Sequence, residues 1–293
     1  MFWSALRRPD WNKEGRNWPY RDNSTFVRDG FFDWHVQTVG EGPSVLLLHG
    51  TAASTHSWAP LAPLLADHFR LVMIDLPGHG FTRPLKPAEI SLRAVGANLA
   101  SLLKRLEIAP EIAIGHSSGA AILIQMILDN GLRPNFMISL NGALRPFSGA
   151  AGVLFPLMAK SLYYNPLAAL FFAESARDPQ RIKRLLSGTG SKPPQETVDR
   201  YAQLLRAPGH INGALAMMAH WRLAAIERRL GEVSVPVLYA AGADDKAVPP
   251  VDAVRLASET KTAISKVLPG LGHLAHEEAP ARVAALIEEF ASG

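Results

Sequence analysis

Residues 115–119 read Gly-His-Ser-Ser-Gly, with a glycine two positions before and two positions after the central serine. The motif follows the apolar run EIAI and precedes the apolar run AAILIQMIL, which predict a buried strand and a helix. A sharp strand-to-helix turn of this kind strains the backbone and exposes the serine oxygen at the helix N-terminus, where amide hydrogens favour negative charge. The pattern therefore predicts Ser117 as a nucleophile. A Gly/Ser turn that merely opens a helix is the alternative interpretation.

A serine hydroxyl needs a base to accept its proton, and in this chemistry the base comes last in the chain, after the final strand. His273 meets this requirement, because it ends a glycine-containing loop that follows the apolar segment 264–268. His276 competes for the role, but two glutamates follow it directly and favour a helix-entry position. The pair does not match the spacing of known metal motifs, so the sequence predicts no metal site. Serine chemistry of this kind needs no cofactor, and none is predicted.

An acid must fix the tautomer of the imidazole and stabilise its charged form. Two adjacent candidates, Asp244 and Asp245, follow the predicted strand 235–240. The spacing to the next Val-Pro pair favours Asp245, and Asp244 is interpreted as a turn residue. The acid could also follow the preceding predicted strand. That place holds Asn141, which cannot carry a negative charge, so Asp245 remains the prediction.

Backbone amides must stabilise the oxyanion that forms when a serine attacks a carbonyl. The amide of Ser118, the residue after the nucleophile, is the first predicted donor. The second comes from the loop 49–58, which is rich in small residues, and is assigned to Thr51 with Ala52 as the alternative. Together these groups predict attack of Ser117 on an acyl carbonyl, followed by hydrolysis of the acyl-enzyme.

Further residues are predicted to line the substrate pocket: His49, Ala52, Asn141, His220 and Trp221. For His49, a structural role in orienting a loop is the alternative interpretation. For His220 and Trp221, packing inside a helical core is the favoured interpretation and pocket lining is the alternative.

The elements that would position these groups alternate along the chain. Short apolar runs predict strands at 31–39, 44–48, 70–74, 111–114, 137–140, 235–240 and 264–268. Helical spacing of apolar residues between them predicts an α/β fold with a doubly wound, mostly parallel sheet and right-handed crossovers.

One stretch breaks this alternation and predicts a helical cap over the sheet edge. From about residue 145 to 229 the apolar spacing is helical, and prolines punctuate short helices. The predicted organisation is therefore an N-terminal arm (1–24), a first core part (25–144), a cap (145–231) and a second core part (232–293). The cap segment carries 12 Lys/Arg against 5 Asp/Glu, a balance of +7.

Composition excludes several classes of protein. The 293 residues contain no Cys, which excludes a disulfide scaffold, a thiolate zinc site and a Cys nucleophile. The net charge of +4 comes without Lys/Arg blocks, so no nucleic-acid partner is predicted. No secretory signal and no uninterrupted apolar run of membrane-spanning length is present, and a cytoplasmic location is expected.

The opening segment combines Trp3, Trp11 and Trp18 with several Lys and Arg residues. An extended arm that packs on the domain through its aromatic rings is the favoured interpretation. Tryptophan next to cations also suits a membrane interface, so peripheral contact with a membrane surface is the alternative.

The motifs described above resemble the α/β-hydrolase superfamily over roughly residues 25–293. The specific marks are HG at 49–50, DLPGHG at 75–80, GHSSG at 115–119, DDKAVP at 244–249 and GLGH at 270–273. Ser118 stands where a smaller residue is expected in this family, a departure of one hydroxyl.

A closer resemblance covers nearly the whole chain, including the cap. Segments such as VLLLHGTAASTHSW, SLNGALRPF, GALAMMAHW and LPGLGHLAHEE are similar to the magnesium-chelatase accessory proteins of bacteriochlorophyll biosynthesis. The resemblance implies a role at the magnesium-porphyrin steps, and magnesium chelatase as a partner. The expected substrate is a hydrophobic ester, such as a porphyrin-linked methyl ester. A non-catalytic porphyrin-binding or chelatase accessory protein on the same scaffold is the alternative.

Overall fold

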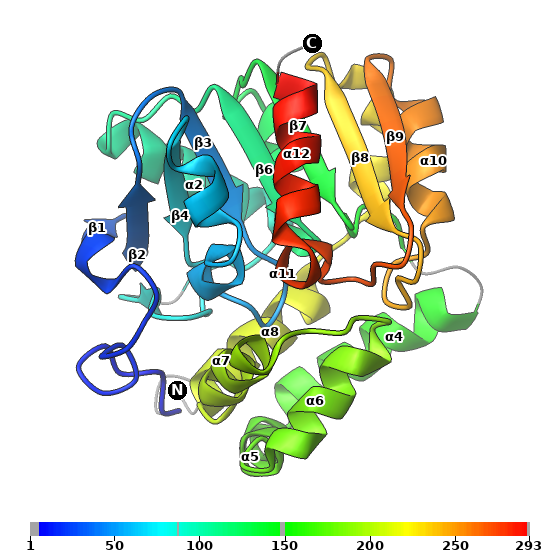
Figure 1. Ribbon diagram of the computed structural model, residues 1–293. Helices are drawn as coiled ribbons and strands as arrows, with labels where there is room; N and C mark the ends of the chain where they lie inside the picture. The colour runs from blue at the N-terminus through cyan, green and yellow to red at the C-terminus, as the bar shows by residue number, and fades with distance from the viewer. Residues whose placement is uncertain (1–5, 87, 147–149, 292–293) are drawn as a thin grey trace.

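The computed structural model describes residues 6–86, 88–146 and 150–291, and within these residues the chain forms a nine-stranded sheet (Figure 1). The strands run in the order β1-β2-β4-β3-β6-β7-β8-β9, and β5 pairs with β2. The six strands from β4 to β9 in this order are parallel, whereas β1, β2 and β5 pair antiparallel. The bounds are β1 (Ser24–Asp29), β2 (Phe32–Val39), β3 (Ser44–Leu48), β4 (Arg70–Ile74), β5 (Arg83–Pro84), β6 (Ile112–His116), β7 (Phe136–Leu140), β8 (Val237–Gly242) and β9 (Ala263–Leu268).

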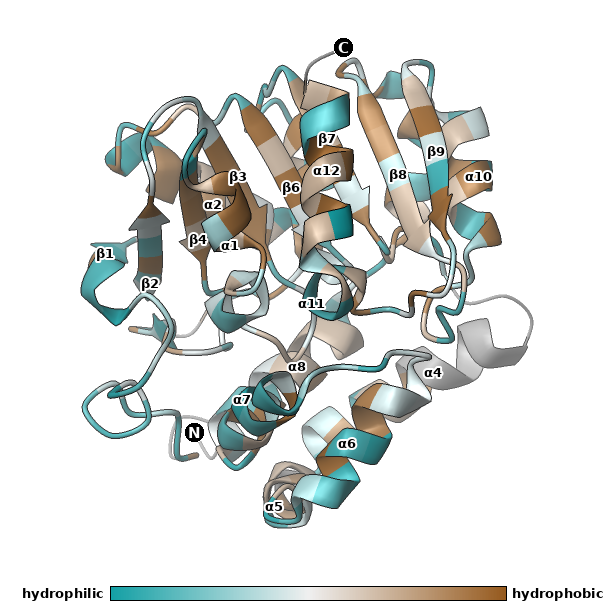
Figure 2. Cartoon of the chain, in the orientation of Figure 1, coloured by the Kyte–Doolittle hydropathy of each residue, from teal (hydrophilic) through white to brown (hydrophobic). Residues whose placement is uncertain are grey.

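The parallel strands are continuous apolar runs because both faces of the sheet are covered. Helices α2 (Leu92–Arg105), α3 (Ser118–Leu128) and α10 (Val251–Glu259) pack on one face through a cluster that includes Leu99, Ile122 and Leu256. Helices α1 (Ala62–Leu65) and α12 (Pro280–Ala291) contribute to a second cluster. Figure 2 shows the brown, apolar strands sandwiched between these helices. The sheet is therefore a buried platform whose strand ends can present loops.

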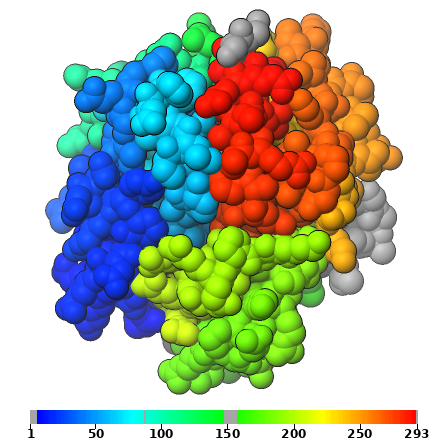
Figure 3. All heavy atoms as spheres, in the orientation of Figure 1, coloured from blue at the N-terminus to red at the C-terminus, as the bar shows by residue number. Residues whose placement is uncertain are grey.

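Within the described residues, six α-helices lie between β7 and β8. Their bounds are α4 (Ala150–Tyr164), α5 (Pro166–Ser175), α6 (Pro179–Gly188), α7 (Gln195–Leu205), α8 (Pro208–His220) and α9 (Ala224–Glu227). Proline opens α5, α6 and α8, where its missing N–H has no partner to lose. Most of the inserted helices form a lobe beneath the ends toward which the parallel strands run (Figure 1), and the same lobe is green to yellow in Figure 3.

Short helical turns complete the chain: η2 (Arg21–Asn23), η3 (Thr55–Trp58), η4 (Leu230–Glu232) and α11 (Ala275–Glu278). None of the helices in the described ranges is both long and apolar enough to cross a bilayer.

Two antiparallel strands, β1 and β5, were not predicted. β1 reads Ser-Thr-Phe-Val-Arg-Asp, and its weak alternation reflects an edge position where one side of the strand faces solvent. Before β1, the rings of Trp11 and Trp18 both pack edge-to-face on Phe81, with centroids 4.8 and 4.9 Å away. Trp3 lies outside the described residues.

Candidate active site

Ser117 lies at the junction of β6 and α3 with φ 51° and ψ −116°, a conformation that non-glycine residues rarely adopt. Steric crowding explains why glycine occupies positions 115 and 119. A Cβ on Gly119 would collide with the carbonyl oxygens of Leu48 and His49, and one on Gly115 would collide with the backbone of α3. The turn can close only because these positions lack side chains, as the sequence motif predicts.

Backbone hydrogen bonds to the next strand hold this strained turn. The Ser117 amide donates to the carbonyl of Leu140 at 2.9 Å, and the Ala143 amide donates to the Ser117 carbonyl at 3.1 Å. Both partners follow or end β7, so the turn is fixed by the sheet itself. A strained residue persists only where its surroundings determine it in this way.

The structure brings His273 and Asp245 together. Nδ1 of His273 lies 2.8 Å from Oδ2 of Asp245, whose side chain is fully buried. Oδ1 of the same carboxylate accepts hydrogen bonds from the amides of Ala247 and Val248 at 2.8 and 2.9 Å. An ionised carboxylate only accepts hydrogen bonds, so Nδ1 carries the proton and Nε2 keeps a free lone pair. Asp244, the other candidate acid, is exposed on the turn.

Asn141 occupies a different place from the predicted one. Its side-chain amide donates to Oδ2 of Asp245 at 2.7 Å and to the carbonyl of Gly272 at 3.2 Å, and the residue is buried. Asn141 therefore supports the acid and the loop of His273 instead of lining the main cavity. It stands after β7, the alternative place for the acid, and its neutral amide supplies the donor that a second carboxylate would lack.

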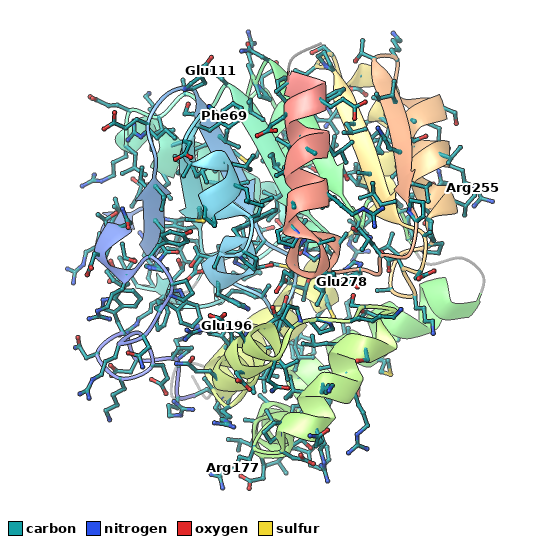
Figure 4. All side chains as sticks on the ribbon, viewed as in Figure 1. Phe69, Glu111, Arg177, Glu196, Arg255 and Glu278 are labelled. Atoms are coloured by element: carbon teal, nitrogen blue, oxygen red, sulfur yellow. The ribbon has the colours of Figure 1, made fainter. Side chains whose placement is uncertain are left out.

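Three more contacts fix the loop that carries His273. His116 donates from Nε2 to the carbonyl of His273 at 2.9 Å, and Ser191 Oγ accepts the amide of Leu274 at 2.9 Å. Burial, followed by the nearby His276, holds the pKa of His116 well below its ordinary value, so this ring is neutral. Glu278, labelled in Figure 4, accepts the amides of Gly272 and of Lys192 in the inserted segment at 3.0 and 2.9 Å.

A buried polar layer lies behind His273. Burial raises the pKa of Glu277 to about 7, although Ser57 and Tyr201 donate hydrogen bonds to its Oε1 at 2.6 and 3.0 Å. Burial, assisted by His273, lowers the pKa of His276 to about 3. His276 lies within α11 and hydrogen-bonds with Ser57, so it has no part in the pairing with Asp245.

Ser117 and His273 line the same cavity, which measures about 300 Å³. Thr51, Ser118 and Trp221 also line it. Apolar side chains supply much of the remaining wall: Ala143, Pro146, Met217, Met218, Leu223, Ala247 and Val248.

Four of the predicted pocket residues lie elsewhere. His49 is fully buried, and its ring accepts the amide of Leu76 at 2.9 Å, which is the loop-orienting role considered as the alternative. Ala52 has φ 64°, and its carbonyl accepts a hydrogen bond from His210 at 3.0 Å. His220 lines a separate groove, and Asn141 contacts the acid. Sequence periodicity cannot distinguish such positions, because they depend on which face of a loop turns inward.

Within the described ranges, no group of three or more His, Asp or Glu side chains is arranged to hold a metal ion. Across the described parts of the chain, the amides of Thr51 and Ser118 make no hydrogen bond. Both residues line the cavity beside Ser117, so these amides are available to a bound group.

Comparison with known proteins decides the family. Residues 43–280 match the family model described as alpha/beta hydrolase fold. The chain belongs to the α/β-hydrolase family. The predicted fold class is thereby confirmed, and hydrolase-named relatives support a hydrolase.

Two relatives and one solved structure illustrate the range of similarity. The magnesium-chelatase 30 kDa subunit of Rhodobacter capsulatus is 37% identical over 94% of this chain and 97% of its own length, which confirms the resemblance stated from the sequence. A pimeloyl-[acyl-carrier protein] methyl ester esterase of Nitrosospira multiformis is 35% identical, over 32% of this chain and 36% of its own. The solved structure of a putative lipase from Acinetobacter baumannii superposes with a TM-score of 0.76 at 20% identity, covering 91% of this chain and 90% of that one, and shows the shared fold.

Proposed function

We propose that this protein is a serine hydrolase in which Ser117, His273 and Asp245 form a catalytic triad. The observation that carries the proposal is the buried His273–Asp245 hydrogen bond of 2.8 Å beside a cavity that also exposes the strained Ser117. The carboxylate holds the proton on Nδ1, which leaves Nε2 as the base for the serine hydroxyl.

The proposed reaction has two halves. Nε2 of His273 accepts the Ser117 proton while Oγ bonds to the ester carbonyl carbon, and the carbonyl electron pair moves onto its oxygen. The tetrahedral intermediate collapses, the alcohol leaves with the proton from His273, and Ser117 carries the acyl group. Water then attacks the acyl-enzyme, again with His273 as the base, and releases the acid and the free serine.

The amides of Thr51 and Ser118 form the proposed oxyanion hole. Both have no partner among the described residues, and the Ser118 amide lies at the N-terminus of α3, where the helix dipole favours negative charge. Preorganised amides contribute most where charge develops in the transition state, and loss of one costs about 3 kcal/mol.

The proposed substrate is a hydrophobic ester. Met217, Met218, Trp221 and Leu223 contribute apolar lining to the cavity, and all four belong to the inserted residues 145–231, which we propose act as the cap. The name of the Rhodobacter relative supports a role near magnesium chelatase, with a porphyrin-linked methyl ester as one candidate substrate.

A fluorophosphonate probe tests this proposal, in parallel with hydrolysis of p-nitrophenyl esters. The wild-type protein should be labelled and should show a burst of p-nitrophenol. Ser117→Ala should lose both signals while keeping its melting temperature, and Ser118→Ala should retain the labelling. Equal labelling of Ser117→Ala and wild type would contradict the assignment of the nucleophile.

A second candidate is a non-catalytic accessory protein of magnesium chelatase on the hydrolase scaffold. The observation that favours it is the 37% identity, over 94% of this chain, to a protein named as a chelatase subunit. A protein that is inert toward the fluorophosphonate and all esters, yet binds protoporphyrin or chelatase subunits equally well as wild type and as Ser117→Ala, would support this candidate.

A further inference from the structure

A second cavity, which we call the basic groove, lies on the other side of the segment that follows α8. It measures about 450 Å³ and lies between the start of α2, the end of α3, and helices α4 and α8. Its charged lining consists of Glu89, Arg93, Asp129, Lys160, Arg222 and Arg229, together with His220. Four permanent cations thus face two carboxylates.

The carboxylates do not neutralise all of these cations. Asp129 lies 3.3 Å from both Arg93 and Arg229, and Arg229 also pairs with Glu232 at 2.9 Å. Across the described ranges, Lys160 and Arg222 are exposed and have no ion-pair partner. Among the described residues, the groove therefore presents two cations without an ion pair, one from α4 and one from the segment after α8, and one carboxylate without an ion pair, Glu89.

One short stretch of chain separates the basic groove from the apolar cavity. Trp221 has the extended angles φ −82° and ψ 137°, so its neighbours point to the opposite side of the chain. His220 and Arg222 line the groove, whereas Trp221 and Leu223 line the cavity that contains Ser117. The Trp221 indole donates to the carbonyl of Ile90 at 3.1 Å, which anchors this dividing wall.

The apolar cavity itself has no free cation in the part of the chain described. The guanidinium of Arg145 lines it but pairs with Glu227 and Glu259 at 2.6 and 2.7 Å. Its volume is also at the lower limit of ligand cavities, which are about 300–1,000 Å³. An ester with a charged second arm would have to place that arm outside the cavity. Two exposed cations that appear in no ion pair of the described residues neighbour the cavity lining in the chain, Arg222 beside Trp221 and Lys246 beside Ala247, and of these Arg222 lines the basic groove together with Lys160.

We infer that the basic groove binds a carboxylate of the same molecule whose ester enters the apolar cavity. The substrate class is then a partial ester of a polycarboxylic acid, with an uncharged ester at Ser117 and an anionic arm at Lys160 and Arg222. This inference rests on the proposed hydrolase function. Guanidinium and ammonium groups in pairs are well suited to carboxylates, because Arg offers a bidentate fork and Lys a mobile charge.

The test compares monomethyl and dimethyl esters of the linear dicarboxylic acids from adipic to dodecanedioic acid. Each pair shares one scissile ester and differs in the distal carboxylate. At one chain length, kcat/KM of the wild-type protein should be about tenfold higher for the monoester than for the diester. That chain length measures the distance between Ser117 and the cations of the basic groove. Added salt should reduce this preference, because both cations are exposed.

Arg222→Gln and Lys160→Gln should each lower the ratio of monoester to diester kcat/KM, mainly through KM of the monoester. Arg228→Gln is the matched control, since Arg228 is exposed, lies near Arg222 in the chain and lines neither cavity. A wild-type protein that labels with fluorophosphonate but hydrolyses monoesters and diesters equally well would overturn the groove inference and leave the hydrolase intact.

Loss of the hydrolase proposal would give a different result. If the wild-type protein neither reacts with the fluorophosphonate nor hydrolyses any ester, titration calorimetry with the dodecanedioic monoester tests separately whether the basic groove binds a carboxylate. Binding that weakens in Arg222→Gln but not in Arg228→Gln would support the anion site. Binding that is absent, or equal in all three proteins, would overturn it.

Discussion

The cavity of this α/β-hydrolase has two walls of different physical character. On the sheet side, Ser117 and His273 line the cavity, and hydrogen bonds from strand ends and loops hold them and the buried Asp245 behind them. The Asp245 carboxylate alone accepts four of these hydrogen bonds. On the helical side, Met217, Met218, Trp221 and Leu223 contact the cavity through apolar surface. Hydrogen bonds on the first side hold individual side-chain atoms in defined positions. The apolar side chains on the second side define only the shape of the cavity.

This difference separates chemistry from selectivity. Proton transfer requires donor and acceptor in defined positions, so the polar wall tolerates little change. Apolar packing tolerates changes of volume more readily, and such changes alter which substrates fit. We therefore expect substitutions on the sheet side to lower kcat and substitutions on the helical side to alter KM and chain-length preference.

Asp245→Asn should produce the largest effect. The amide would no longer accept the Nδ1 proton as a carboxylate does, and the imidazole would adopt the wrong tautomer. A loss of about 10⁴-fold in kcat is expected from this mechanism. Hydrolysis of p-nitrophenyl butyrate measures it, and Asp244→Asn serves as the neighbouring control with unchanged rate. A similar loss in both variants would show that the turn, not the acid, is being perturbed.

Trp221→Ala should act on the helical wall. Removal of the indole widens the cavity and removes apolar contacts with short substrates, so KM for short esters should rise by about tenfold. The kcat/KM of esters with longer acyl chains should rise relative to that of short ones. The chain-length profile of kcat/KM checks this outcome. A uniform fall in kcat with an unchanged profile would mean that both walls contribute to the chemistry, which would break the proposed division.

Ser191→Ala tests a contact that joins the two walls. Ser191 belongs to the inserted segment but accepts the amide of Leu274, beside His273. Its loss leaves a buried N–H without a partner, at a cost of about 1–3 kcal/mol, and should reduce kcat by about tenfold through displacement of the imidazole. The kcat–pH profile should change as well.

Two further variants make this test specific to the positioning of His273. Ser191→Thr keeps the hydroxyl and should restore the profile. Ser187→Ala, an exposed serine of α6, should behave as wild type. If Ser191→Ala lowers the melting temperature but leaves kcat and its pH profile intact, Ser191 has a structural role only.

Glu277→Gln concerns the pH dependence of stability and not the rate of hydrolysis. Burial raises the pKa of Glu277 to about 7, so the folded protein holds this proton more tightly than the unfolded chain. Its contribution to stability is fully present below the unfolded pKa and is lost as pH rises toward the folded pKa. Relative to Glu277→Gln, the wild type should lose up to about 1.4 kcal/mol per pH unit across this window. Urea unfolding at several pH values measures the difference, and parallel curves would contradict it.

Local sequence was sufficient for the parts of the site that depend on backbone sterics and chain order. The Ser117 turn follows from two glycines between an apolar strand and an apolar helix, and the sheet follows from buried runs such as β3 and β6. The edge strand β1 was missed because its half-exposed pattern is weak. Periodicity identifies an element from the alternation of buried and exposed residues, and an edge strand buries few of its residues.

The sequence by itself determined the fold class, the turn at Ser117 and the order of the three candidate triad residues, because each depends on neighbours within a few positions or on chain order. Tertiary structure alone decided that Asn141 donates to Asp245, that Ser191 holds the loop of His273, and that Trp221 divides an apolar cavity from a basic groove. The first two contacts join residues that lie 104 and 83 positions apart, and the third depends on which side of an extended segment a side chain occupies. Such contacts form only when the whole chain packs, since no local spacing encodes the distance between two loops.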